Sequence, residues 1–348
     1  MRSESVFGTA GYVQAWLAGQ LRLGVFLRGG RALLALCHSV SRRTSMLRAM
    51  RLGALFLSAA LVASACAGGD DSASETTTST VPTTTTAVLL SSVVWSRVSH
   101  DEVVFGGVGM QSVTAAGPGL VAVGFNDPLD DFDAIVWTSP DGVTWSRVPD
   151  AEGVFSGAGD QKMVSVTAGG SGLVAVGLAD TDAAVWTSPD GITWSRVPHD
   201  EPVFAGLDGG EMLSVTAGGP GVVAVGWDLS GDPTDAAVWT SPDGVTWSRV
   251  PDAEEVFGGA GDEGMASVAA GGPGLVAVGW DESGDGLVVD AAVWTSPDGI
   301  TWSRVPHNAA VFGRGFQVML EVTVGGPGLV AVGFDVPGAA VWTAVAED

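Results

Sequence analysis

Two residues near the end of the chain break a repeated pattern and could do chemistry. Glu321 stands where four earlier copies of the pattern carry serine, at Ser112, Ser165, Ser214 and Ser267. Arg314 precedes it, in a segment where no other copy has an arginine. A carboxyl group beside a guanidinium can hold a ligand or transfer a proton. Glycoside cleavage usually takes two carboxyl groups, so drift of the repeat, with Glu321 paired to Arg314, is the alternative interpretation.

Short acidic segments could bind a cation. Asp228 and Asp232 flank a glycine turn, and Asp281 and Asp285 do the same. Calcium takes about six to eight oxygen ligands, which such segments offer. A hydrated acidic surface explains them equally well, and we prefer that interpretation. We therefore expect no cofactor, with calcium as the ligand to test.

Other catalytic sets are missing from the repeated region. No cysteine follows Cys66, and the three histidines of this region (His100, His199 and His307) recur at one place in the repeat. That recurrence is typical of an exposed loop position and not of a zinc site. The glycine-rich runs precede no helical pattern, so they do not indicate phosphate binding.

A repeat of about 50 residues must position these groups. The tetrapeptide Trp-Ser-Arg-Val begins at Trp95, Trp145, Trp194, Trp247 and Trp302. Such a period indicates a propeller or a solenoid. Each period contains four apolar stretches of strand length and composition, and none has a helical period. We therefore predict an all-β fold, a five-bladed β-propeller with four antiparallel strands per blade.

The string Ser-Pro-Asp-Gly joins the last two strands in four of the copies. Its residue types suit a type I turn that closes through a glycine bulge. A three-residue loop of this kind predicts that Trp137 faces Trp145 and that Thr138 faces Thr144. The predicted turn residues are Asp141, Asp190, Asp243 and Asp298, with Gly142, Gly191, Gly244 and Gly299.

The two ends of the repeated region complement each other. It begins with one strand, 93–98, and stops after a third strand, 339–345. Pairing of these two strands would complete the fifth blade and leave no sheet edge open. We predict this closed monomer, with an open or domain-swapped assembly as the alternative.

The string Ser-Pro-Asp-Gly-Val-Thr-Trp resembles the Asp-box (BNR) repeat of sialidase-type propellers. The family pattern is Ser-x-Asp-x-Gly-x-Thr-Trp, and each copy here lacks the residue between Asp and Gly. The resemblance covers 93–348 and implies the propeller fold. In that family the box is a structural turn remote from the catalytic centre, so the resemblance implies no activity by itself.

Members of the sialidase family that this repeat resembles share a tyrosine nucleophile and an arginine triad that binds the substrate. The single tyrosine of this chain, Tyr12, lies far upstream of the repeats. The arginines of the repeats all share one outer-strand position, namely Arg97, Arg147, Arg196, Arg249 and Arg304. They are a feature of the scaffold, and we do not expect sialidase activity.

The first part of the chain predicts export. Arginines at 48 and 51, an apolar run over 52–63 and Ala-Ser-Ala before Cys66 are similar to a bacterial lipoprotein signal peptide. The resemblance implies cleavage before Cys66, lipidation of its thiol and anchorage to the outer face of the plasma membrane. The predicted segments are an upstream extension from a misplaced start (1–45), the signal peptide (46–65), a threonine-rich disordered tether (66–92) and the propeller (93–348).

Charge is distributed unevenly along the chain. Eight of its 15 basic residues but one of its 39 acidic residues precede Cys66, which leaves 7 bases against 38 acids. These acids gather in the connections from second to third strand and from fourth to first strand, which open on one face of a propeller. A strongly negative face excludes nucleic acid and anionic membrane as its partners.

Near-identical blades favour repeated weak sites, in which avidity replaces affinity. We therefore expect a cell-surface lipoprotein whose monomeric propeller is a non-catalytic binding module for carbohydrate or an envelope protein. The alternatives are a sialidase-like or other glycan-active enzyme centred on Glu321 and Arg314, and a structural or assembly factor of the cell envelope.

Overall fold

The computed structural model describes residues 96–126, 131–150, 153–205, 209–229, 233–272, 274–282, 289–313, 315–326, 328–336 and 338–345. All of them belong to one unit of the chain, Leu52–Asp348. Five residues with expected roles, Cys66, Trp95, Asp232, Asp285 and Arg314, lie outside the described residues.

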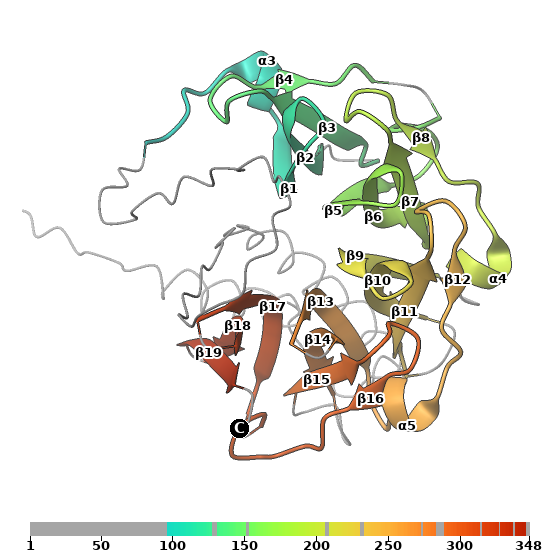
Figure 1. Cartoon of the computed structure of the whole chain (residues 1–348), viewed down its shortest axis with the longest axis vertical. Coiled ribbons are helices and arrows are strands. Elements are labelled where there is room, and N and C mark those ends of the chain that lie inside the picture. Colours follow the sequence, from blue (N-terminus) through green and yellow to red (C-terminus); the bar gives the residue numbers. More distant parts are fainter. Residues whose placement is uncertain are drawn as a thin grey trace, which may run out of the picture. The chain divides into compact units, whose positions relative to one another are not determined.

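The described chain forms five antiparallel sheets in sequence order (Figure 1). Sheet 1 holds β1 (Val108–Ala116), β2 (Gly119–Asn126), β3 (Ala134–Ser139) and β4 (Ser146–Arg147). Sheet 2 holds β5 (Gln161–Gly169), β6 (Gly172–Ala179), β7 (Asp182–Ser188) and β8 (Ser195–Arg196). Sheet 3 holds β9 (Gly210–Gly218), β10 (Gly221–Asp228), β11 (Asp235–Ser241) and β12 (Ser248–Arg249).

Sheet 4 holds β13 (Glu263–Gly271), β14 (Gly274–Asp281), β15 (Asp290–Ser296) and β16 (Ser303–Arg304). Sheet 5 has three strands, β17 (Gln317–Gly325), β18 (Gly328–Asp335) and β19 (Gly338–Val345). Three one-turn helices lie in connections: α3 (Glu102–Phe105), α4 (Glu201–Phe204) and α5 (Glu254–Phe257). No described helix has the length and apolar character needed to cross a bilayer. The expected all-β, propeller-like fold is confirmed, and four of the five described sheets have the expected four antiparallel strands.

The core lies between consecutive sheets. Val174, Val176 and Val185 of sheet 2 pack against Met212 and Trp239 of sheet 3, among other residues of one buried cluster. The same layering recurs between sheets 1 and 2 and between sheets 3 and 4. Because the second strands of sheets 2 and 3 are covered on both faces, they read as continuous apolar runs and not as alternating ones.

A tryptophan on each third strand, buried in the first four sheets, ties a sheet to the connection that leads into it. In sheet 3 the Trp239 side chain is 1% exposed, and its indole Nε1 donates to the carbonyl oxygen of Val203 at 2.7 Å. Equivalent bonds join Trp137 to Val104, Trp186 to Val154, Trp294 to Val256 and Trp342 to Val311. The connection therefore cannot move away without leaving a buried polar group unpaired.

The predicted register of the Ser-Pro-Asp-Gly hairpin is wrong by two residues. In the structure Trp137 pairs with Arg147 and Thr138 with Ser146. The reason is the Asp141 carboxylate, which accepts the backbone N–H groups of Val143 and Thr144. Because those two residues are held in the turn, the fourth strand begins later in the sequence than it would after a three-residue loop.

The described part of the predicted strand 93–98 does not pair with 339–345. Residues 96–98 lie in no strand, and sheet 5 ends at β19. On β19, Val341 is 65% exposed, whereas the equivalent Val185 of sheet 2 is 1% exposed. The apolar residues of β19 are uncovered because no further strand or sheet lies over them in the described part of the chain.

Candidate functional site

The strand register brings polar residues into one row at the acidic end of each sheet. In sheet 4, Glu263 at the start of β13 pairs with Asp281 at the end of β14, and Asp281 pairs with Asp290 at the start of β15. We call these three residues the carboxyl row. The equivalent positions of sheet 3 are Gly210, Asp228 and Asp235, and those of sheet 2 are Gln161, Ala179 and Asp182. At these three positions sheet 4 therefore carries more carboxyl groups than sheet 3 or sheet 2.

Arg304 binds two members of the carboxyl row. Its guanidinium forms an ion pair with Asp281, and its Nη1 lies 3.8 Å from Oε1 of Glu263. Glu263 is 1% exposed, and this burial, reinforced by the charge and hydrogen bond of Asp281, raises its pKa to about 8 against the opposing effect of Arg304. At neutral pH Glu263 therefore carries a proton while Arg304 balances Asp281.

The two calcium candidates that the structure describes form ion pairs with arginines. Asp228 forms an ion pair with Arg249 in sheet 3, as Asp281 does with Arg304 in sheet 4. Among the residues that the structure describes, no group of three His, Cys, Asp or Glu side chains is arranged to hold a metal ion. The sequence pattern marks the outer-strand arginines as scaffold but does not by itself identify their aspartate partners across the sheet. The sequence does contain a signal for these partners, because Asp228 and Asp281 both stand at the end of the second strand in consecutive repeats.

All three repeated histidines contact a carboxylate, and His100 Nε2 lies 3.0 Å from Glu102 Oε2. His307 Nε2 lies 3.7 Å from Asp290 Oδ2, and His199 Nε2 lies 3.7 Å from Asp182 Oδ2. Burial raises the pKa of Asp290, and the nearby His307 opposes that rise. His199 and His307 are exposed and lie in connections outside helices and strands, as expected, while each contacts the aspartate at the start of the third strand of its sheet.

Glu321 lies apart from the carboxyl row, in the middle of β17. Solvent reaches its side chain, but neighbouring strands remove part of its hydration and so raise its pKa, while a hydrogen bond with Ser267 opposes the rise. The serines at this position have a uniform role. Ser112, Ser165, Ser214 and Ser267 each accept the backbone N–H of a valine on the next first strand, at 3.2 Å. The break in the repeat therefore places a carboxyl group where first strands meet.

The Ser-Pro-Asp-Gly turns lie at the opposite end of the strands. In each turn one aspartate oxygen accepts two backbone N–H groups, from Val143 and Thr144 in the case of Asp141. These bonds, the one from threonine first, lower the pKa of Asp141 and Asp243 to about 2. The following glycine has a φ near +80°, which favours glycine. The same bonds recur at Asp190 and Asp298.

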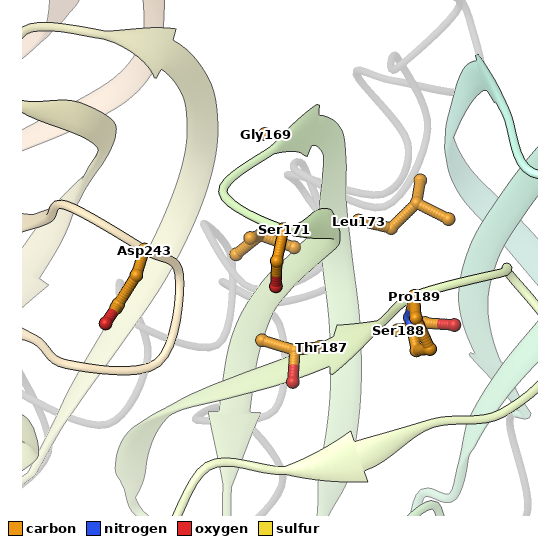
Figure 2. A pocket seen from close by; sticks show the side chains of 8 residues that line it. Gly169, Ser171, Leu173, Thr187, Ser188, Pro189 and Asp243 are labelled. Carbon is orange, nitrogen blue, oxygen red and sulfur yellow. The ribbon is translucent and has the colours of Figure 1, made fainter.

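A pocket of about 270 Å³ opens beside these turns (Figure 2). Thr187, Ser188 and Pro189 line it from sheet 2, and Asp243 lines it from the turn of sheet 3. The Asp243 carboxylate already accepts the backbone N–H groups of Val245 and Thr246. The pocket therefore offers hydroxyl groups but no carboxyl group that is available for proton transfer.

Comparisons with known proteins give structural matches alone. No family model matches the chain, and no curated protein matches it. One matching structure, from Parabacteroides distasonis, is classed provisionally as a glycoside hydrolase; it is 13% identical over 66% of this chain and 84% of its own, with a TM-score of 0.38. A thermostable family-43 glycoside hydrolase is 14% identical over 70% and 95%, with a TM-score of 0.33. Sqt1 from Chaetomium thermophilum is 12% identical over 68% and 69%, with a TM-score of 0.39.

The expectation of a non-catalytic binding module is corrected by these matches. Several of the matching structures are glycoside hydrolases, the class of protein that the alternative interpretation names. Because the TM-scores of these structures all lie below 0.5, the function is argued from the residues of this chain.

Proposed function

We propose that the protein is a glycan-active enzyme in which Glu321 transfers a proton at the glycosidic bond. One observation carries the proposal. Glu321 replaces a structural serine at the meeting point of first strands, and it is both reachable by solvent and raised in pKa. A carboxyl group that keeps its proton closer to neutral pH is suited to general acid catalysis.

The step proposed for Glu321 is hydrolysis. Its carboxyl group gives a proton to the glycosidic oxygen as the bond from that oxygen to the anomeric carbon breaks. Water adds to the anomeric carbon, and the proton that this water releases restores the carboxyl group. Hydrolysis commonly uses a second carboxyl group, and Glu211 and Glu263 are the other acids described on first strands. Glu263 is enclosed with Asp281 and Arg304, so we assign it a structural role.

The proposal includes the full propeller. The five sheets would be five blades, with residues 93–98 completing the last one as its fourth strand and the Ser-Pro-Asp-Gly turns acting as shortened Asp-boxes. In support, residues 95–98 repeat the Trp-Ser-Arg-Val string in which the fourth strand of each complete sheet lies. Export and lipidation at Cys66 would place this domain at the cell surface, where glycans of the envelope are the substrate class.

Replacement of Glu321 tests the activity. In the mature chain from Cys66, Glu321→Gln should lower kcat/KM for release of reducing ends from a glycan panel by about 10²-fold to 10⁴-fold, because the proton donor is lost. Ser214→Ala is the matched control, since it changes the same position of sheet 3 and carries no acid. Cleavage that survives Glu321→Gln, or a folded wild-type protein that cleaves no glycan of the panel, would contradict the proposal.

A second set of variants asks whether another acid takes part. Glu211→Gln and Glu263→Gln are measured in the same assay, with circular dichroism to verify the fold. If Glu263 is structural, its replacement leaves kcat unchanged at pH 6 while altering stability.

A further inference from the structure

Consecutive sheets are joined by a regular series of hydrogen bonds between their first strands. The hydroxyl of Ser112 on β1 accepts from the N–H of Val166 on β5, and the series continues from Ser165 to Val215. It proceeds from Ser214 to Val268 and from Ser267 to Val322. Four bonds therefore join five sheets. The positions left over are the serine equivalent of β17, which is Glu321, and the valine equivalent of β1, which is Val113.

In sheets 2 to 5, one face packs against the preceding sheet. The equivalent face of sheet 1 is uncovered. Met110 on β1 is 39% exposed, whereas its equivalents Met163, Met212, Met265 and Met319 are at most 1% exposed. Val113 is partly exposed, whereas the equivalent valines of the four later sheets are buried. In those sheets the methionine and the valine pack against the preceding sheet.

The opposite face of sheet 5 is uncovered in a matching way. Val341 is 65% exposed, and Val330 and Val332 are partly exposed. Their equivalents in sheet 2, Val185, Val174 and Val176, are at most 1% exposed, because sheet 3 covers them. The two uncovered faces thus have the same residue types, at the same register positions, as the two halves of each formed interface.

The segment that leads into sheet 1 already lies where such an interface needs it. Val98, Val104 and Trp145 line a cavity of about 390 Å³ between this segment and sheet 1. In sheet 2 the equivalent residues Val148 and Trp194 belong to one buried cluster, at 8% and 6% exposed.

We infer that sheet 5 packs against sheet 1 of the same chain and that a carboxyl oxygen of Glu321 accepts the backbone N–H of Val113 across this junction. Glutamate suits the position because its side chain reaches further than serine and offers two oxygens. One oxygen can stay with Ser267 while the other takes the Val113 N–H. The bond rests on the closed arrangement proposed above but not on catalysis, and it would make Glu321 the last member of the series.

Amide hydrogen exchange of the mature chain tests the bond. The Val113 amide should exchange as slowly as the Val166 and Val215 amides, which are held by Ser112 and Ser165. Glu321→Ala should speed exchange at Val113 by about tenfold or more and leave Val215 unchanged. Glu321→Gln retains an acceptor oxygen, so it should preserve most of the protection at Val113.

The outcomes separate this inference from the proposed activity. Slow exchange at Val113 in Glu321→Gln together with lost turnover supports both, and slow exchange in a protein without activity supports the bond alone. Fast exchange at Val113 in the wild-type protein, or no response to Glu321→Ala, overturns the inference. Protection that appears as protein concentration rises, with a dimer by light scattering, also overturns it, because a second copy would then cover sheet 1.

Discussion

Glu263 shows how one side chain can make the stability of the fold depend on pH. It is 1% exposed, and its pKa rises from 4.5 to about 8 on folding because of burial and the neighbouring Asp281. Below pH 4.5 the group is protonated in both states and costs nothing. Between pH 4.5 and about 8 the unfolded chain loses the proton while the folded one keeps it, so the free energy of unfolding falls as pH rises.

Glu263→Gln should remove this loss. Glutamine fits, because sheet 2 carries Gln161 at this position, 3% exposed, with its Nε2 bonded to the carbonyl oxygen of Gly159 at 2.8 Å. The variant should gain on the wild-type protein between pH 5 and pH 8, by on the order of a few kcal/mol in the free energy of unfolding. Urea unfolding at both pH values measures it. Parallel pH profiles for the two proteins would show that Glu263 is ionised in the fold.

Residues are predictable from sequence where the repeat itself marks them. Glu321 stands out because it breaks a row of serines, and the turn aspartates because they recur. The association of Glu263, Asp281 and Arg304 escapes prediction, since these residues are far apart in the chain and meet through register across the four strands of one sheet. To predict which residues meet across strands, the register of each hairpin must be known. The register predicted for the Ser-Pro-Asp-Gly hairpin is wrong.

At the scale of elements, the indole bonds offer a matched pair of variants. Trp239 and Trp342 make the same bond to a loop carbonyl, but Trp239 is 1% exposed and Trp342 is partly exposed. Trp239→Phe should lower the free energy of unfolding by about 2 to 4 kcal/mol, through a cavity and an unpaired buried carbonyl. Under the proposed closure, which covers sheet 5, Trp342→Phe should cost a comparable amount. A loss less than half as large in chemical denaturation would mean that sheet 5 stays uncovered in solution.

The existence of the strands follows from composition, but the start of each fourth strand does not. Val, Ala and Gly runs bounded by turn residues predict the strands of every sheet. The predicted hairpin is two residues off because turn propensity counts backbone residues and ignores the side chain of Asp141. Its carboxylate extends the turn through Val143 and Thr144. A capped turn of this kind is recognised once aspartate is counted as an acceptor for the two residues that follow glycine.

The whole molecule carries its acids close together, and the fold shows the effect. Burial and then the neighbouring Asp252, Glu254 and Asp262 raise the pKa of Asp235 to about 6. Like charges at this end of the sheets therefore oppose folding at neutral pH. Raising NaCl from about 20 mM to about 500 mM should increase Tm, because salt screens exposed charges at this separation.

Calcium separates screening from a specific site. At a constant ionic strength, millimolar calcium should change Tm no more than magnesium does, because Asp228 and Asp281 are held by Arg249 and Arg304. A calcium-specific rise that disappears with chelator would restore the metal site expected from Asp228, Asp232, Asp281 and Asp285. The overall class of fold is predictable from the repeat period, whereas closure is not, because it depends on contacts between the two ends of the chain.

The serine series also sets an order of assembly along the chain. Each first strand receives its serine partner from the sheet made just before it, so a chain emerging from its N-terminal end can add one sheet at a time to a finished surface. Sheet 1 alone has no predecessor, and its exposed Met110 must stay in water until the last sheet has been synthesised. The interval between the first and last sheets is thus when an unfinished chain is most open to pairing with a neighbour.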